Sequence, residues 1–187
     1  LLMKIYEYNN YDDYIEKQKN TTTKKYGKLR YARQSVINQI VKLHKGEVSN
    51  ILCHGARSGE EQKYFKNCYS DAYVIGTELS PLAEEVEMTR IHDFNQPIDE
   101  WIGKFDIIYS NSFDHTISPQ ETMNVWLNQL SSTGRLYLEW SDKRNSEAHE
   151  MDPFSAKETE IIKLASDKYI TSHKADGAKH RSNLIIF

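Results

Sequence analysis

The sequence has little cysteine and no long apolar run. Its 187 residues include only Cys53 and Cys68, which does not support a disulfide framework and fits a reducing compartment. No apolar stretch approaches the roughly 20 residues that a membrane-spanning helix needs, and the opening residues are too short an apolar segment for a signal peptide. We therefore expect a cytoplasmic protein with no membrane partner.

Charged residues are unevenly distributed, although the formal net charge is only −3. Residues 1–50 carry 10 Lys and Arg against 5 Asp and Glu, whereas residues 51–141 carry 6 against 14. The basic excess gathers at Lys24, Lys25, Lys28, Arg30 and Arg33. Such a run is usually a solvated face, and its functional interpretation is the attraction of an anionic small-molecule substrate. A nucleic-acid partner is the weaker alternative, because the chain lacks a basic stripe with interleaved aromatic residues.

Strand-like and helix-like patterns alternate from residue 31 to residue 187. Helices are predicted at residues 31–45, 58–67, 81–87, 119–130 and 156–169, with a helical turn at 99–103. Strands are predicted at residues 51–54, 73–79, 89–93, 105–110, 135–140, 169–174 and 183–187. The alternation predicts one doubly wound α/β domain over residues 31–187, with a mainly parallel seven-stranded sheet, a C-terminal antiparallel strand and helices on both faces.

Two segments have no clear period. Residues 1–30 contain five tyrosines and predict an N-terminal extension that is ordered in part at most. This extension would close over substrate, pack on another subunit or be disordered, and the sequence leaves the oligomeric state open. The long irregular stretch at residues 141–155 predicts a lid or substrate loop, because compact domains rarely hold long loops without a function.

A glycine turn follows the predicted strand at residues 51–54. Gly55 and Gly59 flank Arg57, and Glu78 ends the next predicted strand, 19 residues after Gly59. Glycines let the backbone approach a ligand, and a carboxylate at such a strand end accepts hydrogen bonds from ribose hydroxyls. The pattern fails as a dinucleotide fingerprint, because Arg57 and Glu60 stand where small residues are required. It predicts a site for another adenosine-containing ligand.

With these features the chain resembles the class I S-adenosylmethionine-dependent methyltransferases over nearly all of residues 31–187. Residues 51–59 match the spacing of the family's first motif, residues 105–111 resemble its fourth, and residues 134–138 resemble its turn into the fifth strand. Two positions depart from the family pattern. Cys53 replaces the usual acid, and Arg57 replaces the middle glycine, where a left-handed backbone would cost about 1–2 kcal/mol.

The resemblance implies that the cofactor is S-adenosyl-L-methionine. Glu78 would bind the ribose hydroxyls, Asp93 would meet the adenine amino group, and Phe94 would contact the ring. Arg57 would contact the cofactor carboxylate or the acceptor. The implied cofactor-binding residues are His54, Gly55, Ala56, Arg57, Gly59, Glu78, Leu79, Asp93, Phe94, Ser110 and Asn111. For His54 an equally open interpretation is a satisfied, partly buried histidine.

The resemblance also implies that the strand at residues 105–110 ends near the reactive methyl group and the acceptor. His115 is placed to act as a general base for a hydroxyl acceptor, oriented by Asp114 or Asp142; the alternative is a loop histidine without chemistry. Asn111 is either a second catalytic residue, which positions the acceptor, or a strand-end cap. The family's DNA and amide amino-methylating members carry two prolines after this position. Their absence here argues against that acceptor class.

Together these interpretations predict methyl transfer from S-adenosyl-L-methionine to a small or medium hydroxylated acceptor, such as a sugar or metabolite. Two alternatives stay open. One is a non-catalytic, methyltransferase-like binding module, and the other is a nucleic-acid methyltransferase. No metal site is predicted, because His149, Glu150 and Asp152 have no regular ligand spacing.

Overall fold

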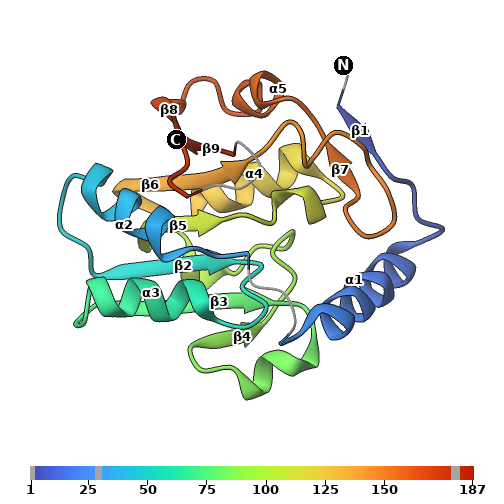
Figure 1. Ribbon diagram of the computed structural model, residues 1–187, viewed down its shortest axis with the longest axis horizontal. Helices are drawn as coiled ribbons and strands as arrows, with labels where there is room; N and C mark the ends of the chain where they lie inside the picture. Colours follow the sequence, from blue (N-terminus) through green and yellow to red (C-terminus); the bar gives the residue numbers. More distant parts are fainter. Residues whose placement is uncertain (1–2, 28–30, 178–181) are drawn as a thin grey trace.

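The fold is built on a seven-stranded sheet that lies between two layers of helices (Figure 1). The computed structural model describes residues 3–27, 31–177 and 182–187. In spatial order the strands are β4 (Thr89–Ile91), β3 (Tyr73–Glu78), β2 (Asn50–His54), β5 (Phe105–Ser110), β6 (Leu130–Trp140), β9 (Asn183–Ile186) and β8 (Thr171–Lys174). Strand β9 is antiparallel to β6 and β8, and the other neighbouring strands are parallel. The predicted sheet is therefore confirmed.

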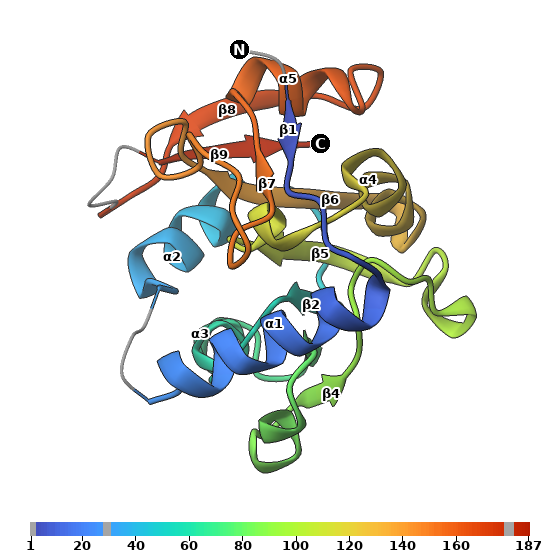
Figure 2. The ribbon, with the colours of Figure 1, turned by 90° about the vertical axis from the view of Figure 1, so that its right-hand side faces the viewer.

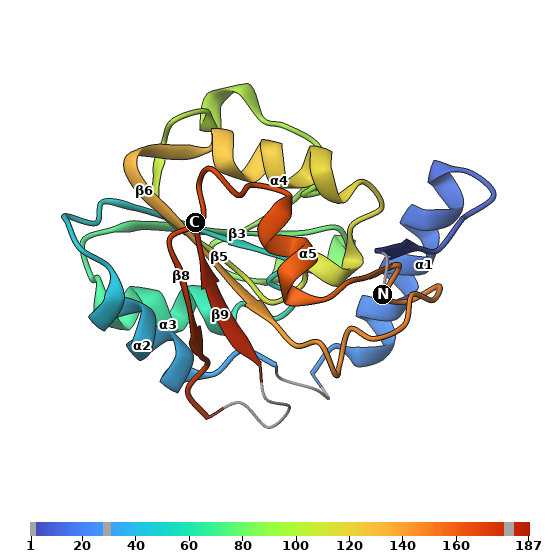
Figure 3. The ribbon, with the colours of Figure 1, turned by 90° about the horizontal axis from the view of Figure 1, so that it is seen from above.

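Both faces of the central strands are apolar. In β2, Ile51 and Cys53 belong to the core cluster of α2 (Gln34–Leu43) and α3 (Glu60–Cys68). Leu52 belongs to the opposite cluster, with α4 (Pro119–Asn128) and α5 (Glu158–Lys163). Figure 3 shows the two helix pairs on either side of the sheet. Burial on both faces is typical of parallel strands, and it fixes the strand ends at which the site is built.

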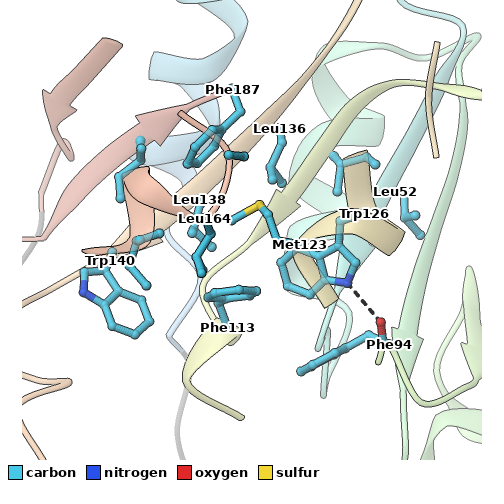
Figure 4. Packing of buried hydrophobic residues seen from close by; sticks show 14 of the residues in the cluster. Leu52, Phe94, Phe113, Met123, Trp126, Leu136, Leu138, Trp140, Leu164 and Phe187 are labelled. Carbon is cyan, nitrogen blue, oxygen red and sulfur yellow. Dashed lines mark hydrogen bonds between the residues drawn. The ribbon is translucent and has the colours of Figure 1, made fainter. Parts of the chain in front are cut away.

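Trp126 of α4 ties two of the loops at these strand ends to the core (Figure 4). Its indole Nε1 donates a hydrogen bond of 3.0 Å to the backbone oxygen of Phe94, which follows β4. Its ring meets the rings of Phe94 and Phe113 edge to face, at centroid distances of 5.3 and 5.2 Å. Aromatic rings favour this arrangement. Trp126 thereby fixes the loops after β4 and β5 against the core.

Several predicted elements are confirmed with different limits. The helix predicted at residues 81–87 is a 3-10 helix, η1 (Pro81–Glu85), and the predicted turn at 99–103 contains η2 (Asp99–Trp101). Helix α5 ends at Lys163, not at residue 169, because the chain continues in tighter turns, with Leu164 N donating to Ile161 O at 3.1 Å. A third 3-10 turn, η3 (Phe113–His115), follows β5.

Strand β6 begins at Leu130, five residues earlier than predicted. Gly134 lies inside this strand and not in a turn before it. A Cβ atom on Gly134 would clash with the carbonyl oxygen of Phe105, beside the irregularity in the β5–β6 pairing. The glycine is therefore needed for close strand packing.

The described N-terminal residues form a helix and a short strand, whereas the sequence predicted a segment that is ordered in part at most. Residues Tyr11–Lys25 form α1, which lies beyond the carboxyl ends of the parallel strands (Figure 2). The Asn10 side chain caps the helix by accepting a hydrogen bond of 2.9 Å from Asp13 N. Strand β1 (Lys4–Ile5) pairs antiparallel with β7 (Phe154–Ser155), so the N-terminal chain holds the predicted loop at 141–155.

Polar contacts dock α1 on the domain. The hydroxyl of Tyr14 donates to the backbone oxygen of His115 at 3.1 Å and accepts from Asn95 Nδ2 at 2.8 Å. The buried face of α1 consists of Tyr14, Gln18, Thr21 and Thr22. Its spacing is helical but three of the four residues are polar, which is why no hydrophobic period marks it. Across the described part of the chain, no helix has the length and apolarity to cross a membrane.

Candidate functional site

The site lies where the loops after the neighbouring strands β2 and β5 meet. Gly55 follows β2 with φ of 73°, and a Cβ there would lie 2.6 Å from Cβ of Ser112. Ser112 Oγ donates to the Gly55 carbonyl at 3.3 Å, and Ser110 Oγ donates to the His54 carbonyl at 3.0 Å. Strand order reverses here, since the chain runs outward from β2 to β4 and returns to β5. Doubly wound sheets bind ligands at this switch point.

The glycine turn itself is unstrained. Gly59 is the N-cap of α3 with φ of 76°, and a Cβ there would lie 2.6 Å from Val86 Cγ1. Among the described residues, Met88 is the one non-glycine residue with positive φ, so Arg57 avoids the expected backbone cost. Cys53 is fully buried, and this burial raises the pKa of its thiol well above its usual value. It is a neutral packing group.

Three cavities adjoin the turn, and Arg57 and Ser112 line all three. We name them by one lining residue each. The Glu78 cavity lies between the ends of β3 and β4 and helix α1, the Ala56 cavity lies beside the start of α3, and the Arg144 cavity lies between the loops after β5 and β6. Because they share lining residues, a ligand can extend from one into the next.

The Glu78 cavity contains the two carboxylates that were predicted for a nucleoside. Glu78 Oε1 accepts hydrogen bonds from the hydroxyl of Thr22 at 3.2 Å and from Ser80 N at 2.9 Å. Asp93 Oδ2 accepts from the hydroxyl of Tyr11. Burial and the Asp93 carboxylate raise the pKa of that tyrosine, so its hydroxyl stays a donor. Hydroxyl groups of α1 therefore occupy both carboxylates.

Helix α1 also borders this cavity. The volume of the Glu78 cavity is about 40 Å³. Tyr14, Gln18 and Thr22 of α1 line one side of it, and Leu79, His92 and Phe94 are among the residues opposite. This space holds only a few water molecules. A nucleoside that binds these carboxylates would displace the hydroxyls of Thr22 and Tyr11.

The orientation of His115 is set by Gln18. Gln18 Nε2 donates to the carbonyl of Met151 at 3.2 Å, so its amide oxygen faces His115 Nδ1 at 2.8 Å. A carbonyl oxygen can only accept, which requires the proton of His115 on Nδ1. In the neutral ring the lone pair is then on Nε2, which is 3.6 Å from Asp152 Oδ1 and 4.0 Å from Asp114 Oδ1.

The Arg144 cavity has a volume of about 250 Å³ and is the larger of the two cavities that border His115. Its lining residues are Lys25, Tyr31, Arg57, Asn111, Ser112, Asp114, His115, Arg144 and Asp152. Asp114 Oδ2 accepts from Asn145 Nδ2 at 2.5 Å and lies 4.0 Å from Arg144 Nη2. Asp142, the other predicted orienting acid, instead accepts from Glu158 N at the start of α5. That part of the prediction is wrong.

Asp114, His115 and Asp152 bring three potential metal-ligand atoms within 4.8 Å of one another. The nearby guanidinium of Arg144 already supplies positive charge to Asp114 and opposes a cation there. The three possible metal ligands considered from the sequence, His149, Glu150 and Asp152, do not form one group. Glu150 pairs with Lys17 at 3.0 Å, while His149 Nε2 lies 3.4 Å from Asp152.

Most predicted site residues line a cavity. These are Gly55, Ala56, Arg57, Glu78, Leu79, Asp93, Phe94, Asn111 and His115. Gly59 and Ser110 shape the two loops and line none of the three cavities.

His54 corrects the prediction of a pocket residue. It is buried, with its ring nitrogens bonded to Thr77 Oγ1 at 3.0 Å and Gln129 Oε1 at 2.9 Å. Burial lowers the pKa of His54 to about 3, so the ring stays neutral. Its ring stacks on Trp126 at a centroid distance of 4.5 Å, which makes it a structural residue of the core.

Solved methyltransferase structures share this architecture at low sequence identity. A 1,6-didemethyltoxoflavin N1-methyltransferase from Burkholderia thailandensis, with bound S-adenosylhomocysteine, gives a TM-score of 0.70 at 14% identity, over 96% of this chain and 90% of that one. A SAM-dependent methyltransferase from Aquifex aeolicus gives 0.62 at 11% identity, over 80% and 87%. The N-methyltransferase NodS from Bradyrhizobium japonicum gives 0.59 at 15% identity, over 80% and 92%.

The sequence matches no protein-family model and no curated protein. The three structural neighbours are methyltransferases, and the resemblance first seen in the glycine turn and the strand-end acids agrees with them. The protein therefore has the Rossmann-like fold of the class I S-adenosylmethionine-dependent methyltransferases.

Proposed function

We propose that this protein is an enzyme that transfers a methyl group from S-adenosyl-L-methionine to a hydroxyl group of a small or medium acceptor, such as a sugar or metabolite. The observation that carries the hydroxyl assignment is His115. Its Nδ1 is hydrogen-bonded to Gln18, which leaves Nε2 of the neutral ring unprotonated. His115 lines both the Glu78 and the Arg144 cavities. Imidazole is a suitable general base near neutral pH.

The residues at the Glu78 cavity fit the cofactor. Glu78 and Asp93 already accept hydroxyl donors, as they would from ribose hydroxyls and the adenine amino group. Gly55 keeps the backbone free of a side chain where the two loops come closest. Phe94, fixed by Trp126, offers a ring face or edge to a base. Glu78, Asp93 and Phe94 would hold the nucleoside, and Arg57 would reach the carboxylate of the amino-acid part.

The bound cofactor supplies an electrophilic methyl group on a sulfonium. The protein's own part is to hold an acceptor hydroxyl in line with that methyl group and to take its proton. His115 Nε2 takes the proton, and the carboxylate of Asp152, 3.6 Å away, stabilises the imidazolium that results. Gln18 keeps the other nitrogen protonated throughout. Asn111, which lines the same cavity, is available to position the acceptor.

The alternatives have lost the features that favoured them. Arg57 carries no left-handed strain and Cys53 packs in the core, so neither marks a degenerate, non-catalytic site. In the basic segment that suggested nucleic acid, Arg33 is engaged with the buried Glu139. Lys28 and Arg30 lie outside the described residues.

Calorimetry with S-adenosylmethionine and S-adenosylhomocysteine tests the proposal directly. We expect both ligands to bind with one-to-one stoichiometry. Failure of well-folded protein to bind either ligand would refute the cofactor assignment. Release of S-adenosylhomocysteine in the presence of hydroxylated but not purely amino acceptors would support the proposed acceptor class.

A further inference from the structure

The Arg144 cavity has a cationic side. Lys25 at the end of α1, Arg57 in the glycine turn and Arg144 in the loop after β6 all line it. Within the described residues, Lys25 has no ion-pair partner, and the guanidinium of Arg57 lies over the ring of Tyr31, with Cζ 5.3 Å from the centroid. Positive side chains from three separate segments thus converge on one cavity.

Three residues that line the same space have a buried donor without a partner. Nδ2 of Asn111 is buried and has no hydrogen-bond partner, although its Oδ1 accepts from Ser112 Oγ at 3.0 Å. Asn111 as a whole is only 8% exposed. The Nε atoms of Arg57 and Arg144 are likewise buried and unpartnered. Buried donors are nearly always satisfied in folded proteins, so this set indicates that an acceptor group from a ligand belongs here.

The cavity also has two acids, Asp114 and Asp152, and Oδ1 of Asp114 is buried without a hydrogen-bond partner. Asp114 is held by Asn145 and lies beside Arg144. Asp152 lies 3.6 Å from His115 and 3.4 Å from His149. These contacts leave the positive charge of Lys25 and Arg57 available to a ligand, while His115 and Asp152 form the end of the cavity where a hydroxyl would react.

We propose that the acceptor carries an anionic group, a carboxylate or a phosphate, which binds among Lys25, Arg57, Arg144 and Nδ2 of Asn111. The substrate class is thus a hydroxylated organic anion whose hydroxyl is presented to His115. This inference rests on the proposed methyltransferase function. Guanidinium groups suit it because they bind carboxylate and phosphate with paired hydrogen bonds.

The cofactor's own carboxylate does not account for this set. Lys25 and Arg144 line the Arg144 cavity but neither the Glu78 cavity nor the Ala56 cavity. Arg57 lines all three and stands at their junction. Two of the cations therefore lie on the acceptor side, beyond the space that the nucleoside and the amino-acid part would use.

The test uses three probes: 4-hydroxybenzoate, its neutral analogue 4-hydroxybenzamide, and inorganic phosphate. Each is titrated into the full chain at constant ionic strength, and binding is followed by the NMR signals of the Arg Nε–H and Asn Nδ2–H groups. We expect saturable shifts with phosphate, with 4-hydroxybenzoate or with both, and at least 10-fold weaker binding of the amide. The phosphate and carboxylate arms show which anion the site prefers.

Variants assign the effect to the site. Arg144→Gln and Lys25→Gln should each weaken anion binding at least 5-fold, Arg144→Lys should retain most of it, and Lys168→Gln, at an exposed position, should not change it. If the Arg144→Gln variant fails to fold, Lys25→Gln still tests the site. Equal binding of amide and carboxylate together with no binding of phosphate, or unchanged anion binding in both glutamine variants, overturns the inference. Calorimetry with S-adenosylmethionine on the same samples shows separately whether the methyltransferase proposal has failed.

Discussion

The side-chain amide of Gln18 and the imidazole of His115 form a hydrogen bond of 2.8 Å between residues 97 positions apart in the sequence. The Met151 carbonyl fixes which end of the amide faces the ring. The N-terminal helix thus determines which nitrogen of the proposed base is free. This makes Gln18 a positioning residue for His115.

Replacement of Gln18 by methionine, which is of similar size but cannot accept the Nδ1 proton, should lower kcat about 10-fold. That loss corresponds to about 1.4 kcal/mol, within the usual range for one hydrogen bond. Nitrogen-15 NMR of His115 should change from the Nδ1–H tautomer to a mixture. Gln18→Glu, which keeps the acceptor, should restore the Nδ1–H form and move the acid limb of the pH profile to higher pH. An unchanged tautomer in Gln18→Met would contradict the assignment.

His115→Ala should lower kcat about 100-fold or more, because a positioned general base contributes at least that factor. The affinity for S-adenosylmethionine should stay within about 3-fold, since the proposed ribose and adenine contacts belong to Glu78 and Asp93. His173→Ala, on the distant strand β8, is the matched control. Turnover that is unaffected by loss of His115 would remove it from the mechanism.

Glu78→Gln should weaken binding of S-adenosylmethionine by about 1–3 kcal/mol, because an amide supplies only one of the carboxylate's two acceptor oxygens and loses the charge. Isothermal calorimetry measures the change. Glu84→Gln, an exposed glutamate of η1, should bind the cofactor normally. Equal affinities in the two variants would show that the cofactor does not use the end of β3.

Much of the fold could be predicted because its signals are local. Strand β5 agrees with the prediction at both ends, since an apolar run bounded by polar residues is sufficient to define a buried parallel strand. Spacing predicts the glycine turn and Glu78, the family resemblance implies Asp93, and all of them lie at the same edge of the sheet.

The missed parts of the site depend on tertiary contacts. Helix α1 buries Gln18 and Thr22, whose partners lie at His115 and Glu78, and a polar buried face leaves no hydrophobic period to detect. The only local signals were the Asn10 cap, the acids in the first turn and the lysines in the last turn. Arg144 was missed because a lone arginine in a loop has no pattern. Its position beside Asn111 appears only in the folded chain.

Thr22→Val should strengthen S-adenosylmethionine binding about 2- to 5-fold. The hydroxyl of Thr22 occupies Glu78 in the ligand-free protein, and removing this competing hydrogen bond is worth up to about 1 kcal/mol. The control is Thr23→Val, since the hydroxyl of Thr23 bonds only within α1, to the Lys19 carbonyl at 2.9 Å. Weaker binding in Thr22→Val would mean that the hydroxyl supports the cofactor instead of competing with it.

Glu61 should lower the stability of the fold as the pH rises from about 4.5 to about 7. Burial raises the pKa of this carboxyl from 4.5 to about 7 in the folded protein. The folded state therefore binds more protons than the unfolded state between about pH 4.5 and 7, and stability declines over this interval and remains lower above it. The full effect is on the order of a few kcal/mol. His54, whose folded pKa is about 3, contributes with the opposite sign and lowers stability as the pH falls below about 6.5.

Urea unfolding of Glu61→Gln at pH 5 and pH 8 separates the contribution of Glu61 from that of His54. The variant should gain stability over the parent chain at pH 8 and little at pH 5, while Glu84→Gln should follow the parent at both. A constant difference between Glu61→Gln and the parent across this range would contradict the raised pKa.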